Sequence, residues 1–365
     1  MQYKTLDSLC KVASGGTPSR SKKEYWDGGD IPWIKIGNIK SKVVSNADEY
    51  ITEAGLNNSS AKLFKKGTIL YTIFATLGEV GILDFDACTN QAIAGISIEK
   101  PEEITTDYLY YYLKSKKAEV NQIGRGVAQN NINLSILRKF SIPLRDIEDQ
   151  KTIVGSLNKV ESIIEKQKRQ LERLDELIKA RFVEMFGMPG ADPFGYGIKE
   201  LGKCCELNPK KAQDKRLTSN IDVSFIPMPS VSENGDIDPT DIRSYEEVKK
   251  GFTYFAENDV LFAKITPCME NGKGAVARGL KNGIGFGSTE FHVLRPIKDI
   301  SNPYWIYVLT SFKSFRKDAE ANMTGSAGQR RTPVSFLDNY KVALPPIYIQ
   351  NQFAAFVAQV DKSKF

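Results

Sequence analysis

Between residues 147 and 186 the apolar residues follow a helical period. The stretch contains no proline and a single glycine, Gly155. The positions that recur every seven residues are Leu157, Ile164, Leu171, Ile178 and Met185. The positions three residues later are Val160, Gln167, Leu174 and Arg181. This spacing predicts a helix with a coiled-coil stripe that is imperfect at Gln167 and Arg181, and Gly187 and Pro189 end it. About 37 residues in a helix extend over roughly 55 Å.

Outside this stretch the pattern changes to short runs with strand character. Examples are IPWIKIGNI, GTILYTI and AIAGISI in the first half and VSFIPM, DVLFAKI and FHVLRPI in the second. Gly- and Asn-containing turn signals separate them. Each half also has one stretch with helical character, at 108–117 and 304–317. The mixture predicts an α+β fold.

The two halves also resemble each other. Residues 129–160 align with 329–360 at a constant offset, so that Gln129 meets Gln329 and Gln150 meets Gln350. Weaker matches precede this block in the same order. A repeat this long indicates a tandem domain duplication, since solenoid repeats are much shorter. We therefore predict a first module at 1–146, a helical spacer at 147–188, a second module at 189–346 and a short helical segment at 347–365.

The long helix between the two modules allows two interpretations. It could be one helix of a globular core, because an apolar stripe must be covered by another element. It could also be a spacer that sets the distance between the modules. Its position between two copies of one domain favours the spacer.

Composition narrows the chemistry. The chain has 365 residues, of which 41% are hydrophobic, and a formal charge of +6. No apolar run is long enough to cross a membrane, and the start lacks a signal peptide, so we expect a cytoplasmic protein. The five cysteines lack metal-ligand spacing, and the single histidine, His292, lies in a strand-like run and is expected to be structural.

Nucleotide- and cofactor-binding motifs are also missing from the sequence. We find no phosphate-binding loop, no dinucleotide fingerprint and no Asn-Pro-Pro-aromatic tetrapeptide of the amino-methyltransferases. One nuclease-like arrangement can be drawn from Asp238, Glu247 and Lys249. Such spacing arises easily by chance in a chain with 44 acidic and 50 basic residues. It remains an alternative, as does a scaffold that binds other proteins.

Two kinds of polar segment suit a polyanion. The first is the glycine-containing N-terminal stretch, where cations alternate with aromatic and short polar side chains: Ser14, Thr17, Ser19, Arg20, Lys22, Lys23, Tyr25, Trp26, Lys35 and Asn38. The second precedes the repeat block in both halves: Arg125, Gln129, Asn130 and Asn131, then Thr324, Ser326, Gln329, Arg330 and Arg331. Lys264 and Lys273 are further candidates. Cations neutralise phosphates, and amides or arginines can recognise base edges, so we predict DNA contact.

The opening SGGTPSR…YWDGGDIPWIKIGNI and the junction NNINLSILRKFSIPLRDIEDQKTIV, followed by a charged helix, resemble the specificity subunits of type I restriction–modification enzymes. The resemblance spans essentially the whole chain. It implies two target recognition domains, each binding half of a split site on double-stranded DNA. It also implies that the helical spacers dock two methyltransferase subunits, with restriction subunits joining the complex. The chain itself would be non-catalytic, with S-adenosylmethionine and ATP bound by the partner subunits.

The sequence departs from the family pattern in one respect. In the family, a second long helix normally follows the second module, whereas only 15 residues follow Gln350 here. We therefore expect the apolar stripe to be covered by self-association or by methyltransferase helices. The residues predicted for this surface are Leu157, Val160, Ile164, Leu171, Leu174, Ile178, Met185, Phe353, Val357 and Val360.

Overall fold

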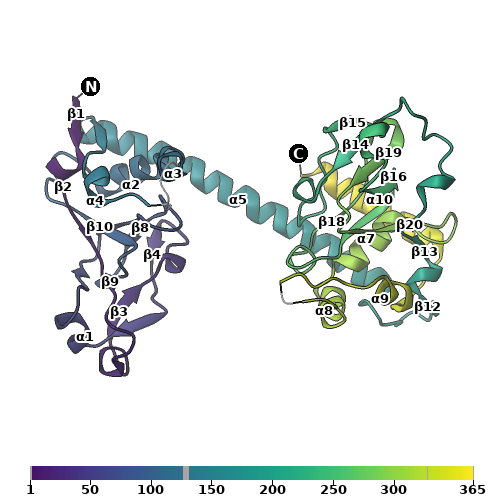
Figure 1. The fold of residues 1–365 in the computed structure, drawn as a ribbon, viewed down its shortest axis with the longest axis horizontal. Helices are drawn as coiled ribbons and strands as arrows, with labels where there is room; N and C mark the ends of the chain where they lie inside the picture. Colours follow the sequence, from purple (N-terminus) through teal and green to yellow (C-terminus); the bar gives the residue numbers. More distant parts are fainter. Residues whose placement is uncertain (1, 126–130, 327, 365) are drawn as a thin grey trace. The chain divides into compact units, whose positions relative to one another are not determined.

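A computed structural model describes residues 2–125, 131–326 and 328–364, without the side chains of 123–125. The chain forms two compact units, Met1–Glu165 and Lys166–Phe365. The helix α5 (Ile147–Phe186) begins in unit 1 and ends in unit 2, as labelled in Figure 1. The predicted long helix is therefore confirmed. Within the described residues, every helix is too short or too polar to cross a lipid bilayer.

Unit 1 contains two larger sheets and one strand pair. The first sheet has the order β2 (Cys10–Ser14), β10 (Ile93–Ile98), β7 (Ile69–Thr72), β8 (Val80–Leu83) and β4 (Val43–Val44). The second has the order β5 (Glu49–Ile51), β3 (Ile31–Ile34), β9 (Ala87–Thr89) and β6 (Leu63–Phe64), with β3 and β9 parallel. The strand pair joins β1 (Gln2–Thr5) to β11 (Ser141–Leu144).

The helices of unit 1 are α1 (Glu53–Asn57), α2 (Thr106–Ser115), α3 (Lys117–Arg125) and α4 (Leu134–Arg138). Leu109 and Leu113 of α2 are fully buried in one core with Ile96 of β10 and Val154 of α5. Within unit 1, α2, α3 and α4 lie near the first turns of α5, and the sheet with β3 lies at the other end (Figure 1). The first turns of α5 are thus part of this core.

Unit 2 repeats this arrangement with one strand fewer in its first sheet. One sheet has the order β13 (Cys205–Leu207), β20 (Phe291–Pro296), β17 (Val260–Ala263) and β18 (Gly274–Val276). The other has β15 (Ile242–Ser244), β14 (Asp222–Ile226), β19 (Ile284–Gly287) and β16 (Thr253–Ala256), with β14 and β19 parallel. The strand pair is β12 (Ile198–Glu200) with β21 (Lys341–Ala343).

The helices of unit 2 are α6 (Tyr245–Val248), α7 (Pro303–Ser311), α8 (Lys313–Ala321), α9 (Val334–Asn339) and α10 (Ile347–Lys362). Their order matches that of α1 to α5, so the predicted duplication is confirmed. The single helical stretch expected in each module is two helices in both units. The second pair separates at Phe312, which is extended (ψ 139°) and buried. Burying this ring stabilises the break in the helix.

A glutamine in the repeated block performs the same structural task in each unit. The Gln150 side-chain oxygen accepts from the Thr105 N–H (2.9 Å), and its amide donates to the carbonyls of Glu103 and Arg145. The Gln350 oxygen accepts from the Asn302 N–H (2.9 Å), and its amide donates to the carbonyls of Ile300 and Pro345. Both glutamines are fully buried. They tie the start of α5 or α10 to the preceding loops.

The buried face of α5 differs from the predicted stripe. In unit 2, Ile178, Phe182 and Phe186 are buried, although the predicted stripe contained neither phenylalanine. Steps of four residues carry the buried face past Arg181, as the 3.6-residue period of a straight helix allows. Met185 and Leu174 are only partly buried against the same core.

The end of the chain covers this part of α5. Phe353 of α10 lies edge-on to Phe182 (5.5 Å) and Phe186 (5.4 Å). Phe353, Val357 and Val360 were predicted on a partner-facing surface, but the structure places them in the core of unit 2. They are buried there because the apolar face of α10 packs on α5 and α7. Leu157, Val160, Ile164 and Leu171 are 37%, 52%, 50% and 38% exposed.

Candidate nucleic-acid interface

In unit 1, the N-terminal polar segment is the loop from β2 to β3 together with the start of the second sheet. The Arg20 guanidinium lies 3.6 Å from the ring centre of Trp26 and 5.0 Å from that of Trp33. Glu49 on β5 pairs with both Arg20 and Lys35. The hydrogen bond from Lys35 is the main reason why the pKa of Glu49 lies below its usual range. This carboxylate therefore stays ionised and holds two candidate cations in place.

The predicted residues of this segment fall into three groups by exposure. Tyr25 and Asn38 are buried, and the Asn38 side-chain oxygen accepts from the Lys35 N–H (2.9 Å). Thr17 and Ser14 are half-buried, and Thr17 donates to Gln91. Those with exposed side chains are Ser19, Arg20, Lys22 and Lys23. These exposed side chains can reach a ligand without rearrangement of the fold.

The second predicted cluster of unit 1 is described only in part. Asn131 forms an isolated antiparallel bridge with Phe74. Gln129 and Asn130 lie outside the described residues, and so does the side chain of Arg125.

In unit 2, the counterpart cluster forms a turn closed by paired backbone. Thr324 and Arg331 exchange two backbone hydrogen bonds (3.0 and 2.8 Å), and the Gln329 N–H donates to the Ser326 carbonyl. The Arg331 side chain makes a bidentate pair with Glu290 (2.9 and 2.8 Å). Hydrogen bonding from Arg331 holds the pKa of Glu290 below its usual range. Nη1 of Arg331 also donates to the Gln329 carbonyl (3.1 Å), so all three guanidinium nitrogens of Arg331 are engaged within the chain.

Three other cations of unit 2 differ in their accessibility. Arg330 lies 3.5 Å from Glu320 and 3.9 Å from Glu270, so both ion pairs are loose. Lys264 is half-buried, and burial lowers its pKa. Lys273 donates to the Met228 carbonyl (3.2 Å). Arg330 is the candidate that is easiest to redirect toward DNA.

One basic loop of unit 2 was not among the predicted segments. The connection from β13 to β14 occupies the place in unit 2 that the loop from β2 to β3 occupies in unit 1. It carries four cations: Lys210, Lys211, Lys215 and Arg216. The two loops share no recognisable sequence, so only their common place in the topology relates them. The one available signal was the density of cations in 210–216.

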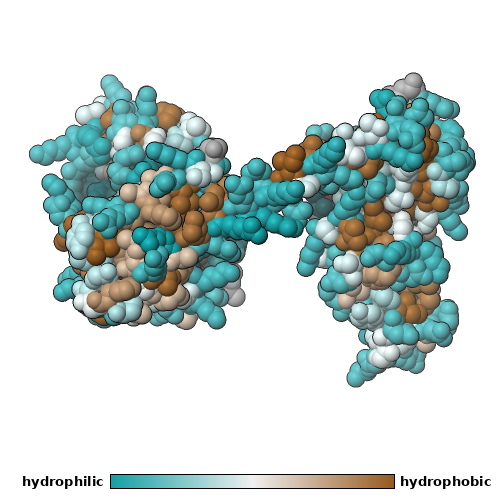
Figure 2. Space-filling model, turned by 180° about the vertical axis from the view of Figure 1, so that it is seen from behind, coloured by the Kyte–Doolittle hydropathy of each residue, from teal (hydrophilic) through white to brown (hydrophobic). Residues whose placement is uncertain are grey.

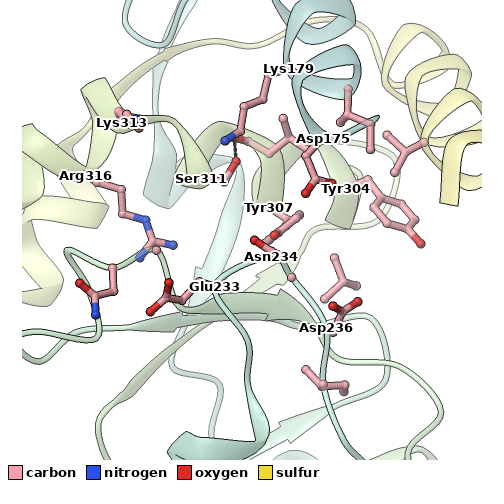
Figure 3. A pocket seen from close by; sticks show the side chains of 18 of the residues that line it. Asp175, Lys179, Glu233, Asn234, Asp236, Tyr304, Tyr307, Ser311, Lys313 and Arg316 are labelled. Carbon is pink, nitrogen blue, oxygen red and sulfur yellow. Dashed lines mark hydrogen bonds between the residues drawn. The ribbon is translucent and has the colours of Figure 1, made fainter. Parts of the chain in front are cut away.

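A cavity of about 1100 Å³ lies within unit 2. Asp175 and Lys179 of α5, Tyr304 and Tyr307 of α7 and Arg316 of α8 line it, as Figure 3 shows. Arg316 is 5% exposed and donates to the carbonyls of Thr310 and Met269, and burial lowers its pKa to about 10. The lining also includes Leu171, Ile178 and Val357, so the cavity adjoins the apolar stripe of α5. It contains none of the predicted DNA-contact residues.

Two of the three nuclease-like residues make contacts with other side chains. The Asp238 carboxylate accepts from the Thr240 hydroxyl (2.6 Å), and Lys249 pairs with its neighbour Glu246. Among the described residues, no group of His, Cys, Asp and Glu has the arrangement of a metal site.

The histidine and the cysteines have structural environments. Because a carbonyl can only accept, Nε2 of His292 donates to the Thr332 carbonyl (2.9 Å), and its unprotonated Nδ1 accepts from Asn208 (3.2 Å). Burial lowers the pKa of this imidazole. All cysteines are free thiols, and burial raises the pKa of Cys88 and Cys204 to about 11. They are therefore thiols, not thiolates, near neutral pH.

Comparison with known proteins identifies the fold. A family model described as "Type I restriction modification DNA specificity domain" matches residues 1–174 and again 193–365. The chain belongs to this family. The two specificity domains correspond to the two structural repeats.

Several relatives carry the same family name. The chain is 45% identical over 165 residues to the type I restriction enzyme EcoAI specificity subunit of Escherichia coli, which is 44% of this chain and 27% of that protein. It is 26% identical over 380 residues to the MjaIX specificity subunit of Methanocaldococcus jannaschii, covering 97% of this chain and 85% of that protein. The match thus spans about a quarter of the Escherichia coli relative and most of the archaeal one.

A solved structure of the type I restriction–modification system has the same fold. Its TM-score is 0.53 at 17% identity, with 100% of this chain and 90% of that chain covered.

Proposed function

We propose that this chain is the specificity subunit of a type I restriction–modification complex and that each unit binds one half of a bipartite DNA site. The observation that carries the proposal is that two specificity domains, whose shared strands have the same order, occur in one chain. Two similar domains in one chain can each bind a different DNA sequence, as a site with two different halves requires. The exposed cations and arginine–aromatic contacts supply the chemistry that phosphates and base edges require.

Catalysis belongs to other subunits in this proposal. S-adenosylmethionine would be bound by the methyltransferase subunits and ATP by the restriction subunits, and the complex would act on DNA in the cytoplasm. The chain purified alone should then neither methylate nor cleave DNA. Magnesium-dependent cleavage by the isolated chain, lost on Glu247→Ala, would instead revive the nuclease alternative.

The exposed stretch of α5 supports docking of methyltransferase subunits. Val160, Ile163 and Ile164 are 52%, 58% and 50% exposed, and Leu171 is 38% exposed. Figure 2 shows apolar side chains gathered on the exposed part of this helix. Contiguous exposed apolar residues on a helix are typical of a protein-binding surface. The double variant Val160→Glu/Ile164→Glu should abolish co-purification with the methyltransferase, whereas Lys166→Glu/Lys168→Glu should preserve it.

Light scattering distinguishes the two kinds of partner. If the chain alone is a stable dimer that dissociates in Val160→Glu/Ile164→Glu, self-association covers this surface instead of the methyltransferase.

The length of α5 sets the gap between the half-sites in this proposal. Its 40 residues correspond to about 60 Å of helix. Inserting four helix-forming residues after Gln167 adds roughly one turn and about 6 Å. The gap should then lengthen by about two base pairs at about 3.4 Å per base pair, with both half-sites unchanged. An insertion that changes a half-site would contradict the assignment of recognition to the two units.

Methylome sequencing tests the whole proposal. Cells that carry this chain with a type I methyltransferase should methylate a bipartite sequence. Arg330→Ala should affect only one half-site, and charge reversal at Lys22 and Lys23 should weaken binding to the other. DNA affinity should also fall steeply with salt, because phosphates are neutralised. Affinity that does not depend on salt would favour the protein-binding scaffold.

A further inference from the structure

In each unit an arginine lies against an aromatic cluster that is built on the second sheet. Trp33 on β3 is in register with Cys88 of its parallel neighbour β9, which is itself paired with Leu63 of β6. Phe225 on β14 is in register with Phe286 of its parallel neighbour β19, which is paired with Tyr254 of β16. Trp33 and Phe225 therefore occupy equivalent positions.

The surroundings of these two rings also match. An outer ring packs edge-on against each one: Trp26 on Trp33 at 5.1 Å and 88°, and Phe252 on Phe225 at 4.8 Å and 83°. The inner rings are buried, and Phe252 is 38% exposed. Each cluster thus presents an aromatic edge at the surface of its unit.

A carboxylate stands at the same register position beside each inner ring. Glu49 of β5 is paired directly with Trp33. In unit 2 the Phe225 N–H donates to the Asp241 carbonyl (2.7 Å), which continues the register of β14 and β15 by one residue. In both units, an acidic residue therefore stands beside the inner aromatic ring at the same register position.

The arginine reaches this frame from different parts of the two units. Arg20 comes from the loop before β3, lies 3.6 Å from the centre of Trp26 and pairs with Glu49. Arg243 comes from β15, lies 3.6 Å from the centre of Phe225, and donates from Nε and Nη2 to Asp241 (3.3 and 2.8 Å). Similarity of sequence cannot explain the match, because the two arginines occupy non-equivalent positions. The shared feature is the assembled cluster.

We infer that Arg20 and Arg243 are specificity-determining residues, each of which donates to a guanine in the half-site bound by its own unit. The inference rests on the proposed function and deepens it. Ring and carboxylate fix the plane of each guanidinium, and the side chains are 53% and 36% exposed. Their remaining N–H groups have no acceptor in the described part of the chain. A fixed planar fork with free donors matches the O6 and N7 acceptors of guanine in the major groove.

Charge favours a base over a phosphate as the partner of Arg243. The Arg243–Asp241 pair has no net charge, so placing it against DNA gains little from counterion release. Hydrogen bonding to a base edge depends on donor geometry and not on net charge. The lysines of the loop 210–216 are better suited to the phosphates.

The test selects binding sites from a library of randomised DNA duplexes. The full chain, co-purified with a type I methyltransferase subunit, should select a two-part sequence. Arg20→Ala and Arg20→Lys should both lose preference at one G·C pair of one half-site, by about tenfold or more. Arg243→Ala and Arg243→Lys should do the same in the other half-site, with the salt dependence of binding unchanged. Lysine keeps the charge but lacks the planar fork.

Matched controls are Lys65→Ala and Lys341→Ala. Each removes an exposed cation that pairs with a carboxylate, Asp86 or Glu200, elsewhere in the same unit. They should leave both half-sites unchanged.

Several outcomes would overturn the inference. If Arg→Lys restored the wild-type sequence preference, the arginines would contact phosphate. If neither Arg→Ala variant changed a base preference, the clusters would only stabilise the sheets. If the wild-type chain selected no sequence at all, the proposed function itself would be refuted, and this inference with it.

Discussion

The two units fill one buried position with different chemistry. In unit 1, the position before β7 is Thr68, whose hydroxyl lies 3.3 Å from that of Ser97. In unit 2, the register of β17 and β20 puts Asp259 and Arg295 at this place, joined by two hydrogen bonds of 2.8 and 2.7 Å. Thr68 and Asp259 are both buried. The fold therefore specifies a hydrogen-bonded pair at this position and leaves its charge to the individual unit.

A second buried position in the same sheet also differs between the two units. His292 in unit 2 pairs with Phe262, where unit 1 pairs Ala94 with Tyr71. His292 and Ala94 are both buried. A polar side chain replaces a methyl group here because the Thr332 carbonyl and the Asn208 amide satisfy both of its nitrogens. What the two units keep in common is the buried glutamine.

The largest expected effect tests that common element. Gln150→Leu or Gln350→Leu leaves one N–H and two carbonyls without their partner, and each substitution should cost about 3–4 kcal/mol of its own unit's unfolding free energy. Denaturant unfolding checks this. Trp26 and Trp33 lie in unit 1 and Trp305 in unit 2, so Trp305→Phe leaves fluorescence that reports unit 1 alone. Substitution of the exposed Gln352 by Leu is the control and should leave stability unchanged. If Gln150→Leu or Gln350→Leu cost less than about 1 kcal/mol, the two glutamines would not have the same structural role.

A matched pair of substitutions tests the position where the units differ. Asp259→Asn removes the charge that faces Arg295, whose side chain is 25% exposed, and should cost about 3 kcal/mol. Thr68→Val removes a neutral hydrogen bond and should cost about 1 kcal/mol. Thermal and denaturant unfolding of both variants measure the difference. Equal losses would mean that the ion pair contributes no more than the hydroxyl pair.

The smallest effect is a pH dependence confined to unit 2. Burial lowers the pKa of His292, so the unfolded chain binds this proton at higher pH than the folded chain. The stabilisation is complete above the unfolded value near 6.5 and is lost as pH falls below it. The cost should not exceed about 1.4 kcal/mol per pH unit. The single histidine gives an NMR titration without overlap. His292→Gln should remove this pH dependence, and a titration at or above 6.5 would contradict it.

Much of the framework could be predicted from the sequence. The repeat at 129–160 and 329–360 includes Gln150 and Gln350, whose partners lie in the loops beside the same helix starts. The long helix was evident from its period. The predicted stripe was correct at Ile178 and wrong at Arg181, because the heptad register omitted Phe182 and Phe186. It also could not show that α10 covers these two rings.

The candidate interface was predictable only where it is local. The opening segment of unit 1 carries its cations and aromatic residues in one continuous run, and the sequence indicated it. In unit 2 the equivalent cluster joins Phe225, Arg243 and Phe252 from separate segments, and nothing in their spacing relates them.

The sequence alone thus determined the duplication, the α+β class and the long helix, because each depends on a periodic or repeated pattern of neighbouring residues. The tertiary structure alone decided which side of α5 is buried and where the second arginine lies. Those features depend on strand register and on contacts between distant segments, and a linear pattern of polar and apolar residues does not encode them locally.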